Sequence, residues 1–385
     1  MIFEPTTSGS TITFILVSTV LLAIWLENHT RVFKKLGAAA LSILLAMLCS
    51  NLGLIPGKSP VYDMFRGPGV LAGITLFLLT VDLGSIRAAG GPMLKAFLLG
   101  ALGAAVGGAA MGLVLADAIG PDTWKLSGQF AATYIGGGVN FAAVGQALNT
   151  SSEYFTAGVA ADVIVTAIWL IVCIAIPEYF GISDTDSDAS SIPGSARNRD
   201  ATISNLLQST GKPVRLWDLA ALAFIVMSCL WLAEQIASLV PLIPMIIWLT
   251  TLALILAQVP AVQGLSGSLV LGNYLLLLFL ATNGAISVIA RIVEIGPAIF
   301  FFALGTVFIH GVIIFGIGIM LRIDSKVIAI ASQANVGGAS SAMAIAGARG
   351  APQLILPGIA VGLLGTALGN YVGLLVANLM KLVVA

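Results

Sequence analysis

Long apolar segments follow one another from end to end of this 385-residue chain. Each is close to the ~20 residues that a helix needs to cross a bilayer, which predicts an all-α polytopic membrane protein. A polar stretch rich in Ser, Asp and Arg separates a first set of segments from a second. The first set runs over 11–26, 37–55, 66–86, 93–119, 125–148 and 154–178, and the second over 216–238, 241–259, 264–289, 297–321, 325–348 and 353–380.

The two sets of segments resemble each other. From 131 to 167, an ungapped shift of 200 positions places the second half on the first, and a constant register over two consecutive segments indicates an internal duplication. We therefore divide the chain into a first transmembrane repeat (1–180), a cytosolic polar loop (181–213) and a second transmembrane repeat (214–385). The shift aligns Gly137 with Gly337, Gly138 with Gly338, Gly158 with Gly358 and Thr166 with Thr366.

The positive charges predict how the chain is threaded through the membrane. With the N-terminus outside, Arg31, Lys34 and Lys35 fall inside, as the positive-inside rule requires. The basic residues of the polar loop also fall inside if segment 125–148 enters the membrane and returns on the same side. Each half then has about five transmembrane helices plus one re-entrant or broken glycine-containing helix. Because an odd number of crossings inverts the second half, the charges predict two inverted-topology repeats.

Composition supports the class of protein and limits its chemistry. Hydrophobic residues make up 58% of the chain and charged residues only 9%, whereas soluble domains carry about 25% charged residues. The net charge of zero predicts no nucleic-acid partner. The three cysteines lie in apolar segments without a metal-binding spacing, and the chain has only two histidines. We therefore expect no cofactor and no metal other than a bound Na⁺ ion.

Two glycine clusters, "YIGGGVN" and "NVGGASS", interrupt otherwise helix-like apolar segments. Irregular backbone at membrane depth is tolerated only where it is buried in protein or lines a watery cavity. Freed N–H and C=O groups beside neutral amides and hydroxyls can bind a solute or Na⁺. The alternative is that these glycines only permit close helix packing, which we expect for "GALGAAVGGAAMG" (100–112). The predicted substrate-binding residues are Thr133, Gly136, Gly137, Gly138, Asn140, Gln333, Asn335, Gly337, Gly338, Ser340 and Ser341.

Carboxylates inside membrane spans are costly and indicate function. Asp162 lies on the segment that follows the first glycine cluster, and we predict that it binds Na⁺ or carries H⁺. The alternative for Asp162 is pairing with backbone or interfacial water. Asp82 is a second candidate, although a local ion pair with Arg87 competes with a role in transport. Asn283 lies at the corresponding place in the second half, and we group Asp162, Asp82 and Asn283 as ion-coupling residues.

The paired segments, the polar middle loop and the two motifs "TYIGGGVNFAAV" and "SQANVGGASSAMA" resemble one known family. This is the membrane-protein family called domain of unknown function 819, grouped with the cation:proton antiporter and anion transporter superfamily. Bile-acid, glutamate and citrate sodium symporters are relatives in that superfamily. The resemblance implies an inverted-repeat fold with a scaffold part and a mobile core part, and a homodimer is common among such proteins.

Citrate symporters carry a glycine-pair motif at the tips of re-entrant hairpins, and this chain matches the pair but lacks the glycine expected after it. Val139–Asn140 and Ala339–Ser340 stand at that place instead. This departure leaves the substrate open, and it leaves open whether each glycine segment is a hairpin or a broken crossing helix.

These observations favour a secondary active transporter with a midplane site between the repeats, working by alternating access. We predict Na⁺- or H⁺-coupled uptake of a small organic solute, either a carboxylate or an amino-acid- or peptide-like molecule. The partners are then the lipid bilayer and the solute, and the location is the bacterial cytoplasmic (inner) membrane. A monovalent cation/proton antiporter is the alternative, and an intramembrane aspartyl protease using Asp82 and Asp162 is a remote one. We expect no enzymatic activity.

Overall fold

The computed structural model describes residues 8–179, 213–349 and 351–384, and in these residues it contains helices and no strands. This confirms the predicted all-α class. The predicted polar loop, apart from its last residue, lies outside the described residues. The elements are α1 (Gly9–His29), α2 (Arg31–Asn51), α3 (Pro60–Met64), η1 (Phe65–Gly69), α4 (Val70–Leu78), η2 (Leu83–Ala88), α5 (Gly90–Val114), α6 (Ala116–Ile119), α7 (Thr123–Gly136), α8 (Gly138–Ala147), α9 (Ser152–Tyr179), α11 (Leu216–Leu239), α12 (Met245–Ala257), α13 (Pro260–Gln263), α14 (Ser268–Ile286), α15 (Ile289–Met320), α16 (Ser325–Ala348), η4 (Pro352–Leu354) and α17 (Ile355–Val384).

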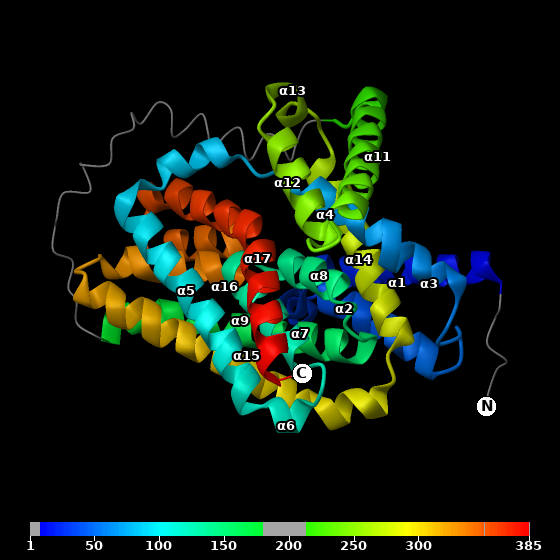
Figure 1. The fold of residues 1–385 in the computed structure, drawn as a ribbon, viewed down its shortest axis with the longest axis horizontal. Coiled ribbons are helices and arrows are strands. Elements are labelled where there is room, and N and C mark those ends of the chain that lie inside the picture. The colour runs from blue at the N-terminus through cyan, green and yellow to red at the C-terminus, as the bar shows by residue number, and fades with distance from the viewer. Residues whose placement is uncertain (1–7, 180–212, 350, 385) are drawn as a thin grey trace.

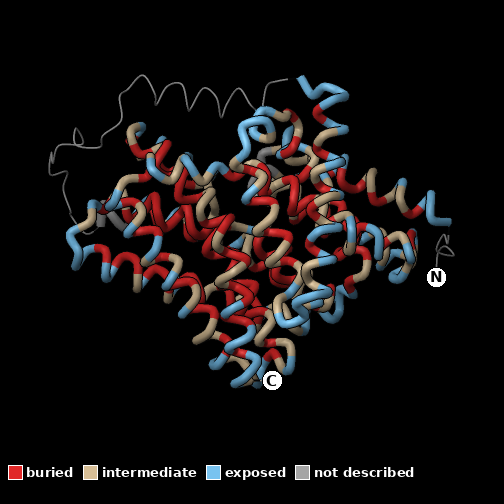
Figure 2. The backbone as a smooth tube through the Cα atoms, turned by 45° about the horizontal axis from the view of Figure 1, so that its top comes forward, coloured by how far each residue is buried: buried red, intermediate tan, exposed pale blue. Residues whose placement is uncertain are grey.

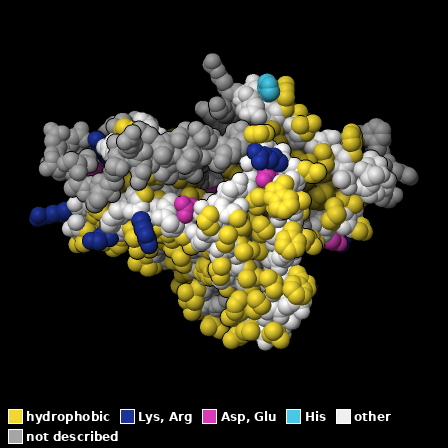
Figure 3. All heavy atoms as spheres, turned by 90° about the horizontal axis from the view of Figure 1, so that it is seen from above, with side chains coloured by type: hydrophobic (Ala, Val, Ile, Leu, Met, Phe, Trp, Pro, Cys, Tyr) yellow, Lys and Arg dark blue, Asp and Glu magenta, His cyan; other side chains and the backbone are white. Residues whose placement is uncertain are grey.

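Among the described residues, 7 helices are long and apolar enough to cross a membrane: α1, α5, α9, α11, α14, α15 and α17. Their outward faces carry large exposed hydrophobic side chains, including Phe14, Leu102, Phe224 and Phe308. Figure 3 shows hydrophobic side chains spread over one face of the molecule, with few charged side chains among them. An apolar surface of this kind is expected where helices face lipid.

The helices form two groups that lie beside each other (Figure 1). In the peripheral group, α14 packs against α2 and α4, α1 packs on α2, and α11 packs on α12. In the hairpin group, α5 packs on α15, α7 packs on α17, and α16 packs on both α9 and α17. The largest buried cluster runs through the hairpin group, and Figure 2 shows the buried backbone concentrated in the middle of the molecule.

Glycines on α5 allow the close contacts of the hairpin group. A Cβ on Gly107 would lie 2.6 Å from the carbonyl oxygen of Thr306 on α15, and a Cβ on Gly103 would lie 2.9 Å from the Cα of His310. A Cβ on Gly108 of the same helix would lie 2.7 Å from the carbonyl oxygen of Ser127 on α7. The prediction that this glycine-rich stretch serves helix packing is therefore confirmed.

The apolar segment predicted over 66–86 is not one helix, and the prediction of a single span there is wrong. It begins in the π-helical turn η1, continues as α4, and leaves helical geometry after Leu79. Pro68 lies within η1, where its ring cannot continue a regular α-helix because it lacks an N–H donor. At the other end Asp82 caps the 3₁₀ turn η2 through the Gly84 amide, at 2.8 Å.

Candidate functional site

The first glycine cluster turns the chain back on itself. Gly137 separates α7 from α8 with φ 91°, a conformation that favours glycine. The Nε2 atom of Gln129 donates to the carbonyl oxygen of Phe141 at 3.2 Å. These two residues would be about 18 Å apart along a continuous helix. Segment α7–α8 is therefore a helical hairpin with its tip at Gly137, here called the first hairpin.

The second glycine cluster forms a second hairpin within α16. Its non-helical residue is Gly338, with φ 77°. A Cβ on Gly358 of α17 would lie 2.8 Å from Cγ2 of Ile330 and 3.2 Å from Cβ of Ala342. In a straight helix Ile330 and Ala342 would lie about 18 Å apart. Since both contact the same position on α17, the two arms of α16 lie side by side. The structure thus selects hairpins over broken crossing helices.

The turning glycines differ from the predicted register by one residue. The ungapped shift of 200 pairs Gly137 with Gly337, but the positive φ values fall at Gly137 and Gly338. Three residues beyond each turn stand Asn140 and Ser341, which are therefore the structurally matching pair. The shift of 200 is wrong at the tips, because several small residues in a row align equally well at either register.

The two tips meet on α17. A Cβ on Gly365 would overlap the carbonyl oxygen of Ile135 beside the first tip. A Cβ on Gly362 would lie 2.6 Å from the backbone of Ala339 at the second tip. Gly362 and Gly365 are separated by about 4.5 Å along the helix axis. Both hairpins therefore contact the same turn of α17, as predicted for two glycine clusters that share a site.

Hydrogen bonds hold the first tip on α17. The Nδ2 atom of Asn140 donates to the carbonyl oxygen of Gly365 at 3.2 Å. The hydroxyl of Thr366 donates to the carbonyl oxygens of Gly136 and Gly362, each at 3.3 Å. One hydroxyl on α17 therefore joins the first tip to the turn that carries the second.

Open space and unpartnered oxygens adjoin the tips. A Cβ on Gly137, Gly138 or Gly338 would meet no atom within 4 Å. Within the part of the chain that the structure describes, two buried oxygens of the first hairpin, Oγ1 of Thr133 and Oδ1 of Asn140, have no hydrogen-bond partner. Two more such oxygens are Oε1 of Gln333, near the second tip, and Oδ1 of Asn370 on α17. Buried polar atoms are rarely left unpaired, so these oxygens are candidate ligands for a cation or solute.

The other residues predicted at the second tip have different surroundings. Ser340 is exposed, and the Ser341 hydroxyl donates to the carbonyl oxygen of Gly337 at 2.8 Å. Asn335 is fully buried, and in the amide orientation that satisfies both its polar atoms it donates to Phe97 on α5 at 3.3 Å. Its side chain therefore packs against α5 rather than at the tip, and Asn335 is better placed to hold the hairpin than to bind a solute.

Asp162 lies beside the first hairpin. Its carboxylate accepts a hydrogen bond from the Thr166 hydroxyl at 3.2 Å, one turn along α9. The hydroxyl of Tyr134, close before the first tip, lies near the same carboxylate, and within the described residues it is buried without a hydrogen-bond partner. The predicted ion-coupling carboxylate and the predicted substrate tip are thus neighbours, although they lie on different helices.

The other two predicted ion-coupling residues lie elsewhere. Asp82 is exposed, and the hydrogen bond described for its carboxylate is the local one to the η2 turn. Asn283 is buried in α14 of the peripheral group, where its Nδ2 atom donates to the carbonyl oxygen of Phe279 at 2.9 Å. The structure therefore leaves Asp162 as the one member of the predicted trio beside a hairpin tip.

A buried polar network was missed by the sequence analysis. Ser332 on the second hairpin accepts a hydrogen bond from Nε1 of Trp169 on α9 at 2.9 Å. Its hydroxyl also bonds Nε2 of His310 on α15 at 2.9 Å. The other ring nitrogen of His310 lies 2.8 Å from the carbonyl oxygen of Gly100 on α5. No spacing along the chain signals this network, because its members come from four helices.

Gln129 ties the arms of the first hairpin together, and replacing it with alanine is expected to lower stability. Its Oε1 atom accepts from the Thr150 hydroxyl at 2.9 Å, in addition to the bond its amide donates to Phe141. Two buried groups would be orphaned at a cost of about 1–3 kcal/mol each. Thermal unfolding of the purified protein should show a lower Tm than wild type. Gln235→Ala, at an exposed position on α11, is the control, and equal Tm values for both variants would contradict the assignment.

Long apolar helices and two glycine-tipped hairpins define the class of this chain as an integral membrane protein. The family described as "Protein of unknown function (DUF819)" matches residues 13–383, and the chain belongs to that family. The predicted family is thereby confirmed. The chain is also 27% identical over 377 residues to the "Uncharacterized membrane protein YjcL" of Bacillus subtilis (strain 168). That match covers 92% of this chain and 93% of the relative.

Proposed function

We propose that this protein is a secondary active transporter that takes up a small organic solute, coupled to Na⁺ or H⁺. The observation that carries the proposal is the meeting of two glycine-tipped hairpins on one turn of α17, beside open space. Unwound backbone at membrane depth has few other uses, because each freed N–H or C=O group must find a partner. Such tips are suited to hold a solute at the middle of the membrane.

Alternating access is supported by the way the two halves contact each other. The contact of α7 with α17 has its counterpart in the contact of α16 with α9. Equivalent helices also pair across the halves, α4 with α14 and α5 with α15. Such contacts between the equivalent helices of two halves are expected for inverted-topology repeats related by a pseudo-two-fold axis. We propose that the hairpin group moves against the peripheral group to expose the tips to each side in turn.

Coupling to a cation is proposed to run through Asp162. A half-buried carboxylate beside a hairpin tip can exchange Na⁺ or H⁺ as the surroundings of the tip change. The unpaired oxygens of Thr133 and Asn140 offer hard neutral ligands of the kind that alkali cations accept. Asp82 is exposed and caps the η2 turn, which argues against an aspartyl protease that uses Asp82 and Asp162. The outside N-terminus, the bacterial inner membrane and a homodimer stay predictions.

A sodium-dependent change in thermal stability tests this proposal. Saturating Na⁺, compared with the same concentration of choline, should raise the Tm of the purified protein, since a ligand at 100 times its Kd stabilises by about 2.7 kcal/mol. Asp162→Asn should remove that response. If protons are the coupling ion, Asp162→Asn should instead flatten the dependence of Tm on pH.

The matched control is Asp117→Asn, because Asp117 is an exposed carboxylate on the short helix α6. This variant should keep the wild-type response to Na⁺ and to pH. Sodium and pH responses that are the same in Asp162→Asn as in wild type would eliminate Asp162 as the coupling group. Exchange of Na⁺ for H⁺ in vesicles without any organic solute would favour the antiporter alternative.

A further inference from the structure

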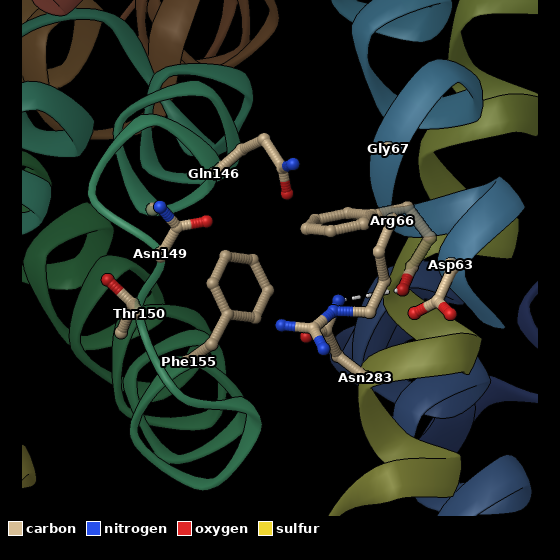
Figure 4. A pocket seen from close by; sticks show the side chains of 10 residues that line it. Asp63, Arg66, Gly67, Gln146, Asn149, Thr150, Phe155 and Asn283 are labelled. Atoms are coloured by element: carbon tan, nitrogen blue, oxygen red, sulfur yellow. Dashed lines mark hydrogen bonds between the residues drawn. The ribbon is translucent and has the colours of Figure 1, made fainter. Parts of the chain in front are cut away.

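A cavity of about 260 Å³ lies where the first hairpin meets the peripheral group. One wall comes from the end of α8 and the loop that follows it, and the opposite wall from α3, η1 and α14 (Figure 4). The side chains that give the cavity its chemistry are those of Asp63, Arg66, Gln146, Asn149, Phe155 and Asn283. With the ring of Phe279, which also lines it, the cavity combines a cation, a carboxylate, three amides and two aromatic rings, an unusual set between membrane helices.

Arg66 is the main unsatisfied group in this cavity. Figure 4 shows its side chain extending from η1 toward Phe155 on the opposite wall. Its Nε atom is shielded from solvent and has no hydrogen-bond partner, and within the described residues the guanidinium forms no ion pair. A guanidinium presents a planar fork of donors that matches a carboxylate. The guanidinium therefore has donors available for an anion that enters the cavity.

Arg66 lies in an irregular helical turn that directs its side chain. Residues Phe65–Gly69, "FRGPG", form the π-helical turn η1, in which the amide of Val70 bonds the carbonyl oxygen of Phe65. One extra residue in a helical turn rotates the side chains that precede it relative to those that follow. Such π-bulges occur frequently at functional sites. The local backbone thus departs from a regular helix where the cavity begins.

Asp63 supplies the opposite charge at the rim. It is exposed, precedes Arg66 by one helical turn, and forms no ion pair with it. Two opposite charges that line one cavity without pairing can each accept a separate group of the same ligand. A dicarboxylate would be repelled by Asp63, and a simple amine would be repelled by Arg66. The phenyl rings of Phe155 and Phe279, which also line the cavity, accommodate an apolar side chain.

We propose that this cavity is an entry subsite for a zwitterionic solute of amino-acid or dipeptide size. Arg66 holds the carboxylate, and Asp63 holds the ammonium group. This inference rests on the proposed transport function and deepens it, because it chooses between the solute classes that the hairpin tips leave open. It also supplies a cationic residue, a type that the motifs "YIGGGVN" and "NVGGASS" do not contain.

The subsite is connected to the first hairpin. The ring of Phe155 packs at a tilt against that of Phe141 on α8, with centroids 5.2 Å apart, and the centroid of Phe141 in turn lies 5.5 Å from that of Phe130 on α7. Thr150 lines the cavity and donates to Gln129 inside the hairpin. A solute in the cavity therefore touches residues whose positions depend on the hairpin, so its arrival can be sensed at the tips.

The first test measures binding by thermal shift of the purified full-length protein. The zwitterionic probes are L-alanine, L-leucine, L-phenylalanine and glycylglycine, and the comparison probes are propionate, succinate and ethylamine. At least one zwitterion should raise the Tm and bind about tenfold more tightly than the comparison probes. Arg66→Gln and Asp63→Asn should each weaken zwitterion binding about tenfold. Asp63→Asn should at the same time improve the binding of propionate.

The control for charge removal is Arg291→Gln, because Arg291 is an exposed arginine that pairs with Glu294 on α15 outside the cavity. It should bind zwitterions like wild type. Failure of every zwitterion to bind, equal binding of propionate, or unchanged binding by Arg66→Gln would each overturn the subsite. The sodium response that depends on Asp162 is measured on the same proteins. A subsite that fails while that response persists leaves the proposed transport function standing.

A second test does not depend on choosing the right solute. Cysteine replaces Gln146, which lines the cavity from α8, after the native Cys49, Cys173 and Cys229 have been changed to alanine. A negatively charged sulfonate thiol reagent should then react faster than a positively charged trimethylammonium one, because Arg66 attracts anions into the cavity. Adding Arg66→Gln should abolish this preference. An unchanged ratio of the two rates would show that Arg66 does not set the charge of the cavity.

Discussion

Replacing Gly365 with alanine is expected to separate the first hairpin from α17 and to abolish the sodium response. The new Cβ would overlap the carbonyl oxygen of Ile135 and lie 3.1 Å from the Cα of Gly136. Both are backbone atoms, so no rotamer change can make room for it. Overpacking of this kind costs roughly 3 kcal/mol. The displaced tip would also lose the hydrogen bond from Asn140. Thermal unfolding with and without Na⁺ measures both effects.

Gly316→Ala is the control for this experiment, because Gly316 lies on the exposed face of α15 and is not among the predicted site residues. A Cβ there meets no described atom within 4 Å, and its φ does not lie in the left-handed region. Its Tm and its response to Na⁺ should stay close to those of wild type. If Gly365→Ala is as stable and as sodium-sensitive as Gly316→Ala, the two tips do not depend on their contact with α17.

The second large effect is expected from Ser332→Ala, which removes the centre of the buried network. Nε1 of Trp169 and Nε2 of His310 would both lose their partner in a region from which solvent is excluded. Each orphaned group costs about 1–3 kcal/mol. The variant should therefore unfold at a clearly lower temperature. Hydrogen exchange in the second hairpin should also become faster, because α16 would be held less firmly on α9 and α15.

Thr306→Val is the matched control, since Thr306 is equally buried on α15 but bonds only within its own helix, to Phe302. It should cost far less than Ser332→Ala. A double-mutant cycle with Trp169→Phe separates the network from a general packing loss. Additive effects of Trp169→Phe and Ser332→Ala would show that the two side chains are not energetically coupled.

The sequence predicted the two interruptions of helical backbone because their physical signal is local, although it left open whether each is a hairpin or a broken crossing helix. Glycines among polar residues inside an apolar segment mark backbone that cannot stay helical in contact with lipid. The sequence alone could not show which glycine adopts the turn conformation, since Gly136, Gly137 and Gly138 are the same residue type. Only Gly137 adopts a positive φ. The same ambiguity explains why the predicted alignment of the two glycine clusters is displaced by one residue.

The directions of polar side chains could not be predicted. Asn335 lies in the same motif as Gln333, yet its amide bonds Phe97 on another helix. Asp82 appeared to be an intramembrane carboxylate until α4 proved to end before it. The segment predicted as a span over 66–86 begins at Arg66, and most of the residues that line the cavity with Arg66 come from parts of the chain more than 75 residues away. Such sites depend on contacts between distant helices, which no local pattern encodes.

The sharing of α17 has a consequence for how this architecture can be built. The first hairpin packs on α17, which the second half contributes, and the second hairpin packs on α9, which the first half contributes. A fragment that ends before α17 would leave the first hairpin without that cover, and a fragment that begins after α9 would remove one of the helices that hold the second hairpin. Each hairpin is completed by a helix from the other side of the polar loop, so the two parts of the chain have to fold together.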